Sequence, residues 1–199
     1  MKIRIIAVLF FALFFFASGK AQNARFGAGI IGGLNASQIL GDDTGGYNKL
    51  GLQGGLRGIA HLTDRSDLYI ELLYSQRGSY QKGIIDIDLK YVEVPVVLTF
   101  KDWLDEEGEF YKVAANIGFS YGRLLNATAE GSKHDDIVNL FNDNDISFTV
   151  GAEYFTRENF GFGIRWSKSI NFLYNKDKHD PGRNSLRGFF LSFRGVFTF

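Results

Sequence analysis

Three features of the sequence predict an all-β fold. Hydrophobic residues recur at every second position in eight separate segments, which is the period of a β-strand with one apolar face. The chain has 24 glycines and 16% aromatic residues but only two prolines, a composition typical of many strands joined by turns. The connections alternate in length, as in an up-and-down barrel. Together with the polarity of the two strand faces, these features predict an eight-stranded antiparallel up-and-down transmembrane β-barrel.

The amino terminus has the organisation of a signal peptide. Two basic residues precede an apolar run of 13 residues, and Gly19 and Ala21 are the small residues that signal peptidase requires. The run is shorter than the roughly 20 residues of a transmembrane helix. We therefore predict cleavage after Ala21, with residues 1–21 as signal peptide and residues 22–199 as the barrel domain.

Composition excludes several classes of function. The 22 acidic residues balance the 22 basic ones, so there is no electrostatic argument for nucleic-acid binding. The chain has no cysteine, which excludes disulfides, thiolate metal sites and the lipidated cysteine of a lipoprotein. We predict no cofactor.

The first three predicted strands carry few charges. Residues 25–37 alternate apolar side chains with glycine and asparagine. Residues 50–62 place a row of leucines opposite Arg57, and residues 67–80 place leucine and isoleucine opposite Glu71. Arg57 and Glu71 thus fall on the polar faces of their segments.

The fourth predicted strand, residues 84–100, has two apolar rows that differ in phase. A slip of one residue turns every later side chain to the other face, so we predict a β-bulge between Lys90 and Val92. The part before the bulge is predicted to project beyond the membrane as a hairpin with the third strand. Pro95 cannot donate to the strand ladder and weakens pairing locally.

The next two predicted strands are residues 110–125 and 145–155. Both alternate apolar residues with glycine, serine, threonine or asparagine. Residues 126–144 form the longest loop between them, with a helical turn predicted at residues 135–141.

The last two predicted strands are residues 160–174 and 187–199. The final strand presents a row of phenylalanines on one face and ends on an aromatic residue. It resembles the closing strand of bacterial outer-membrane barrels, which implies that Phe193, Phe197 and Phe199 form a signal for the outer-membrane assembly machinery. This strand is predicted to close the barrel by pairing with the first.

The orientation of the faces separates two kinds of barrel. A secreted lipocalin-like ligand-binding barrel has apolar residues inside and polar residues in water. Here the polar faces are rich in Gly, Ser, Thr and Asn and poor in charge, as a barrel lumen is. The apolar rows carry aromatic residues toward their ends, as the girdles of a membrane barrel do. These are Phe26, Tyr74, Phe100, Tyr111, Tyr121, Tyr154, Phe160 and Trp166. The outer membrane and its lipid are therefore the predicted surroundings.

Six charged residues lie on the predicted lumen faces, in the half nearer the periplasm. They are Arg57, Glu71, Glu93, Glu153, Arg165 and Arg194. Three acids and three arginines sum to zero, and an eight-stranded barrel is narrow enough to be filled by side chains. Buried charges persist when they are paired. We predict one neutral ion-pair network that plugs the barrel.

No catalytic or metal-binding motif is present. The three histidines, His61, His134 and His179, lie far apart in different predicted elements. No serine or second acid forms a recognisable catalytic arrangement with them. We therefore expect a protein that is not an enzyme.

The stretch YVEVPVVLTF resembles the Tyr-x-Glu-x-Pro strand of the PorT-like outer-membrane barrels of Bacteroidetes, with Tyr91, Glu93 and Pro95 as the motif. The glycine-rich first strand and the terminal phenylalanine strand add to the resemblance. It implies a Gram-negative outer membrane, that of a Bacteroidetes species. Two functions stay open: a structural or interaction protein of the cell envelope that binds a partner through extracellular loops, and an accessory of type IX protein secretion or transport.

Overall fold

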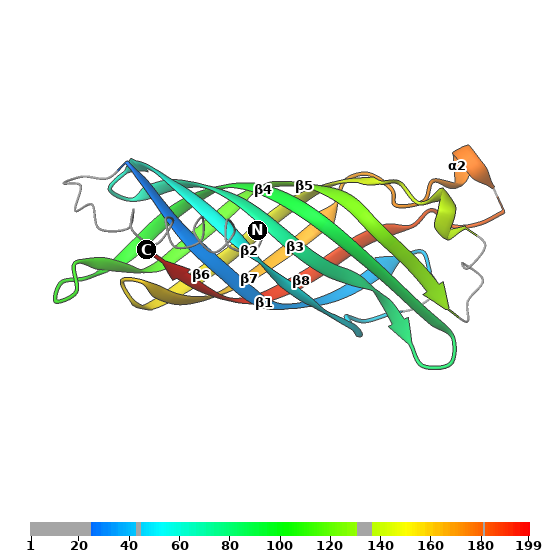
Figure 1. Ribbon diagram of the computed structural model, residues 1–199, viewed down its shortest axis with the longest axis horizontal. Coiled ribbons are helices and arrows are strands. Elements are labelled where there is room, and N and C mark those ends of the chain that lie inside the picture. The colour runs from blue at the N-terminus through cyan, green and yellow to red at the C-terminus, as the bar shows by residue number, and fades with distance from the viewer. Residues whose placement is uncertain (1–24, 43–44, 131–136, 181) are drawn as a thin grey trace, which may run out of the picture.

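The computed structural model describes residues 25–42, 45–130, 137–180 and 182–199, and eight antiparallel strands form a closed barrel there (Figure 1). The strands are β1 (Phe26–Leu40), β2 (Lys49–Thr63), β3 (Ser66–Gln81), β4 (Ile85–Asp105), β5 (Phe110–Glu130), β6 (Asn144–Arg157), β7 (Phe160–Ser169) and β8 (Arg187–Thr198). The predicted cleavage residues, Gly19 and Ala21, lie outside the described residues. The all-β barrel with its predicted number of strands is confirmed.

Two short helices lie in the described parts of the loops. They are η2 (Val138–Leu140), within the stretch where a helical turn was predicted, and α2 (Lys176–His179). No helix in the described part of the chain is long and apolar enough to cross a membrane.

The strands are strongly tilted. A path that starts at Phe26 of β1 and steps from each residue to its paired neighbour on the next strand returns to β1 at Ala36. It is displaced by ten residues along β1. The path passes through Ala60, Leu68, Leu98, Ile117, Val150, Trp166 and Leu191. For eight strands such a stagger corresponds to a tilt of about 35–45° from the barrel axis. Residues at the same height on neighbouring strands are therefore not paired with each other.

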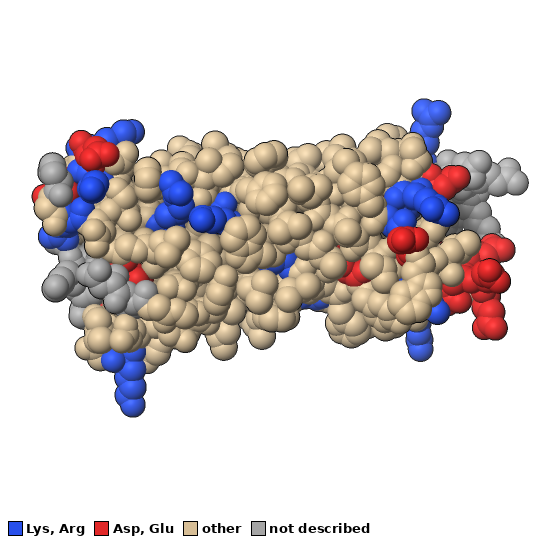
Figure 2. All heavy atoms as spheres, turned by 180° about the vertical axis from the view of Figure 1, so that it is seen from behind, with Lys and Arg blue, Asp and Glu red and all other residues tan. Residues whose placement is uncertain are grey.

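Most outward side chains are apolar, and most side chains in the middle of the lumen are polar. Phe119 is 57% exposed on the outer face, whereas Asn35 and Ser192 are fully buried in the lumen. On the face that Figure 2 shows, uncharged side chains cover most of the surface between the two ends of the barrel. This polarity is the reverse of a lipocalin, so that alternative is wrong.

Strands β3, β4 and β5 extend furthest at one end, which Figure 1 shows on the right. Strand β4 pairs with β5 as far as Glu130, whereas β5 pairs with β6 only as far as Arg123. The longer connections lie at this end, which is the extracellular end of an outer-membrane barrel. The predicted projecting hairpin is present.

The predicted bulge is found, but in a different strand. Pairing shifts register between Lys90 and Tyr91, where Lys90 lies opposite Asn126 and Tyr91 opposite Leu124. The extra residue is therefore Leu125 of β5, and β4 keeps a single alternation along its length. Its first apolar row points inward and the second points outward, because the lumen is apolar near its extracellular mouth.

The barrel closes between β1 and β8, as predicted. Gly33 lies opposite Arg194, and a Cβ atom at Gly33 would be 2.1 Å from the carbonyl oxygen of Phe193. A glycine is needed there because the two backbones approach closely. The neighbouring Gly32 faces outward and has no atom within 4 Å of a Cβ position.

Candidate functional site

Five of the six predicted lumen charges meet in one cluster at the middle of the barrel. These residues, the central cluster, are Arg57, Glu71, Glu153, Arg165 and Arg194, and all are at most 3% exposed. They come from β2, β3, β6, β7 and β8, so the cluster joins opposite walls of the lumen.

Glu71 is the hub of the central cluster. Its Oε1 lies 2.8 Å from Nη2 of Arg57, and its Oε2 lies 2.7 Å from Nη1 of Arg165 and 3.1 Å from Nη1 of Arg194. Glu153 accepts from Arg57 at 2.6 Å and from Arg194 at 2.9 Å. Three arginines face two glutamates, so the central cluster carries a net charge of +1.

The predicted membership of Glu93 in this network is wrong. Glu93 pairs with Arg77, whose Nη2 lies 3.1 Å from Oε1 of Glu93 and 3.0 Å from Oδ2 of Asp145. These three residues form an upper cluster nearer the extracellular end, with a net charge of −1. The two clusters together are neutral, although neither is neutral alone.

The sequence reasoning missed Arg77 and Asp145 as members of a buried network. The alternation of the third strand already places Arg77 on the same face as Glu71. Arg77 lies nearer the extracellular end of its strand, outside the half of the barrel in which the six predicted charges fall. Near the start of its strand, Asp145 shares by the same alternation the lumen face of Ser147 and Thr149.

The Tyr-x-Glu-x-Pro motif lies on the lumen face and holds Arg77. The guanidinium carbon of Arg77 lies 4.0 Å from the ring centre of Tyr91, and Glu93 supplies its carboxylate. Pro95 also faces the lumen, opposite Ser120 of β5. Two of the three motif residues, Tyr91 and Glu93, thus contact the guanidinium group of Arg77.

Polar and apolar side chains fill the lumen around the two clusters. The Nδ2 of Asn35 donates to Ser75 at 2.9 Å, and Ser192 donates to Asn35 at 2.8 Å, which links β3, β1 and β8. Closer to the periplasmic end, Tyr69 lies with its ring centre 4.3 Å from the guanidinium carbon of Arg57.

An apolar cap closes the extracellular end. Its buried members are Ile39, Ile85, Ile87, Leu89, Tyr91, Ile137, Phe141, Leu173, Tyr174 and Leu186. The seventh strand was predicted to continue to Tyr174 but ends at Ser169, and Tyr174 instead bridges to Leu186 within the cap. The described loop residues of the cap, from Ile137 to Phe141 and from Leu173 to Leu186, therefore pack over the lumen at this end.

Outside the membrane, Lys49 ties β2 to the projecting hairpin. Its Nζ donates to Asp86 and lies 3.3 Å from Asp88. Partial burial lowers the pKa of Lys49, but the hydrogen bond to Asp86 and the two aspartate charges outweigh it, so the pKa is raised above its ordinary value.

A cavity opens at the periplasmic end of the lumen. It has a volume of about 400 Å³ and is lined by polar and aromatic side chains. Asp67 is buried in its wall, 2.8 Å from Nδ1 of His61 and 3.1 Å from Nζ of Lys101. Among the described residues, no group of three or more His, Asp or Glu side chains is placed to hold a metal ion.

The terminal phenylalanines face outward from β8 and the chain end. Phe193 is 51% exposed, Phe197 40% and Phe199 74%. Phe193 lies opposite Leu34 of β1 and Phe197 opposite Ile30. Their role as an assembly signal stays a prediction.

Comparisons with known proteins agree with the geometry. The family model for the outer membrane protein beta-barrel domain matches residues 7–189. The solved structure of Ail, the attachment invasion locus protein of Yersinia pestis, is 13% identical over 88% of this chain and 100% of that chain, with a TM-score of 0.51. Neisserial surface protein A is 12% identical over 88% of this chain and 98% of that chain, with a TM-score of 0.46. No curated protein matches the chain.

At these identities the similarity to Ail shows the fold alone. The family match covers most of the sequence, and the outward apolar surface is what a barrel in lipid requires. The location is therefore the outer membrane of a Gram-negative bacterium. The chain belongs to the outer membrane protein β-barrel domain family.

Proposed function

We propose that the protein is a non-conducting barrel without enzymatic activity, which serves as a structural or interaction protein of the cell envelope. The observation that carries this proposal is the filled lumen. The central cluster spans the middle of the barrel, the upper cluster lies above it, and the apolar cap covers the extracellular mouth. We infer that the described residues leave no continuous aqueous path through the lumen, as expected for the narrow interior of an eight-stranded barrel.

The extracellular extension of β3, β4 and β5 is the proposed interaction surface. The outward residues Asp86, Asp88 and Lys90 are polar, in contrast to the apolar residues further down β4. Ile84 in the turn of the hairpin is 53% exposed. This surface stands clear of the apolar belt and suits a polar partner outside the cell.

Conductance in planar bilayers tests the closed lumen. We expect no steady current steps from the purified wild-type protein. A variant with serine in place of Arg57, Glu71, Glu153 and Arg194 removes two charges of each sign and keeps the net charge, and we expect it to conduct. Steady conductance by the wild type would refute the closed lumen.

Photo-crosslinking on intact cells tests the interaction surface. A crosslinker at Ile84 should capture a cell-envelope component, while one at Leu104, at the periplasmic end of β4, should not capture the same component. The two positions are similarly exposed, at 53% and 49%. Equal capture at both positions would argue against an extracellular partner.

The second candidate is a PorT-like accessory of type IX protein secretion in a Bacteroidetes outer membrane. The Tyr91, Glu93 and Pro95 motif supports it, and the periplasmic cavity favours it by offering a recess to a partner inside the envelope. Deletion of the gene would then abolish export of type IX substrates. Normal export by the deletion strain would exclude this role.

A further inference from the structure

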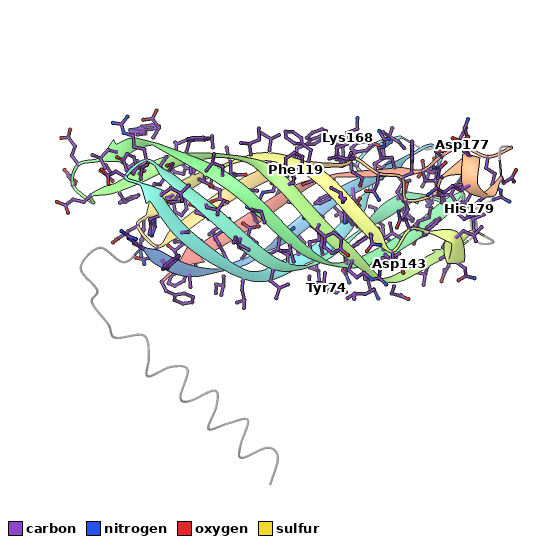
Figure 3. The ribbon with its side chains drawn as sticks, turned by 90° about the horizontal axis from the view of Figure 1, so that it is seen from above. Tyr74, Phe119, Asp143, Lys168, Asp177 and His179 are labelled. Carbon is purple, nitrogen blue, oxygen red and sulfur yellow. The ribbon has the colours of Figure 1, made fainter. Side chains whose placement is uncertain are left out.

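Two cations lie side by side on the lipid-facing surface near the extracellular rim. Lys168 is the last outward residue of β7 and lies opposite Phe189 of β8. Arg187 is two residues from Phe189 on the same face, at the start of β8. Diagonal neighbours of this kind have Cα atoms about 7–8 Å apart. Figure 3 shows Lys168 on the outer wall of the barrel.

Neither cation has an acidic partner within the described ranges. No described carboxylate lies within 4.0 Å of either side chain. The Nε atom of Arg187 is buried without a hydrogen-bond partner in the described structure. By contrast, Arg123, another outward cation, is paired with Asp143 at 2.9 Å. Two adjacent like charges at the edge of an apolar belt repel each other and require a counter-ion.

Aromatic side chains surround the pair. The guanidinium carbon of Arg187 lies 4.4 Å from the ring centre of Phe172. Tyr47 packs edge-on against Phe189 with ring centres 5.2 Å apart, and the indole Nε1 of Trp166 donates to the Tyr47 hydroxyl at 3.3 Å. Trp and Tyr in such positions mark the level of the lipid headgroups. The two cations therefore stand at the height where lipid phosphates lie.

We propose that Lys168 and Arg187 bind the phosphate of a phosphorylated glycolipid in the outer leaflet. The outward side chains of β8 on the membrane side of the two cations are apolar and can contact the acyl chains of the glycolipid, and Phe193 is half-exposed on this face. The Lys168 ammonium and the Arg187 guanidinium neutralise the phosphate, and Arg187 can offer two parallel N–H groups to it. A lipid fits this position better than a soluble anion because the site adjoins hydrocarbon.

Native mass spectrometry of the purified barrel tests the proposal, with bis-phosphorylated lipid A as the probe. We expect K168Q/R187Q to bind it about tenfold more weakly than the wild type, because each basic residue near the headgroups adds to the attraction. Dephosphorylated lipid A should bind both proteins equally and weakly. The heat-dependent gel shift verifies that each variant is folded, and the single variant R187Q provides a second folded protein with an intermediate loss.

The matched control is K90Q/R123Q, which removes one lysine and one arginine from the outward face of β4 and β5. We expect its affinity for lipid A to equal that of the wild type. An equal loss of lipid A affinity in the two double variants would mean that only the total positive charge matters, and it would overturn the site. Undiminished binding by K168Q/R187Q, or strong binding of dephosphorylated lipid A by the wild type, would also overturn it.

Discussion

Replacement of Glu71 by glutamine is the sharpest perturbation of the central cluster. The glutamate accepts hydrogen bonds from Arg57, Arg165 and Arg194 through both oxygens. Glutamine has nearly the same shape but keeps only one acceptor oxygen, and its amide NH₂ must face arginine donors. The central cluster then holds three arginines against Glu153 alone, and its net charge rises from +1 to +2.

The expected cost follows from burial. Glu71 is 1% exposed, so water cannot replace the lost acceptor. Removing one partner of a buried ion pair costs about 3–5 kcal/mol because the remaining charge is left uncompensated. The double variant E71Q/R165Q restores the net charge of +1. We therefore expect it to be more stable than E71Q, although it lacks one more charged residue.

Urea unfolding in lipid vesicles, followed by tryptophan fluorescence, measures both variants. The unfolding free energy should fall by about 3–5 kcal/mol for E71Q and recover in part for the double variant. R165Q alone completes the double-mutant cycle. Two results would contradict a stabilising role for these ion pairs. One is an unfolding free energy of E71Q within about 1 kcal/mol of the wild-type value, and the other is a loss in the double variant equal to the sum of the losses in E71Q and R165Q.

Three further predictions concern other parts of the chain. Gly33→Ala should destabilise the barrel by about 1–3 kcal/mol because its Cβ meets the backbone of Phe193, while Gly32→Ala should change stability by less than about 0.5 kcal/mol, as urea unfolding can measure. Because the pKa of Lys49 is raised, its ion pairs with Asp86 and Asp88 stabilise the projecting hairpin fully below about pH 10.5, and this stabilisation is lost as the pH rises through the folded-state pKa. Proteolysis of the hairpin should therefore accelerate up to about fivefold above that pKa. The Lys49→Met variant should show no such acceleration. Deletion of Phe199 should slow membrane insertion in cells, and an unchanged rate would contradict the assembly signal.

The two-residue period of the sequence determined most of the fold. It set which side chains face lipid and which face the lumen, because successive residues of a strand point to opposite faces. Arg57 and Glu71 could therefore be placed inside the barrel, and the pairing of the first and last strands could be expected because a barrel leaves no free edge. The change of phase near Tyr91 was visible, although its assignment to a bulge in β4 was wrong.

Only the tertiary structure decided which lumen residues share a height. Counting from strand ends placed Glu93 with Glu71, but the ten-residue stagger around the barrel shifts each strand relative to the next. Strands of 21 and 10 residues also rise to different levels. Glu93 therefore meets Arg77 and Asp145 above the central cluster. The contacts across a tilted barrel depend on this stagger, and a single strand's sequence contains no information about it.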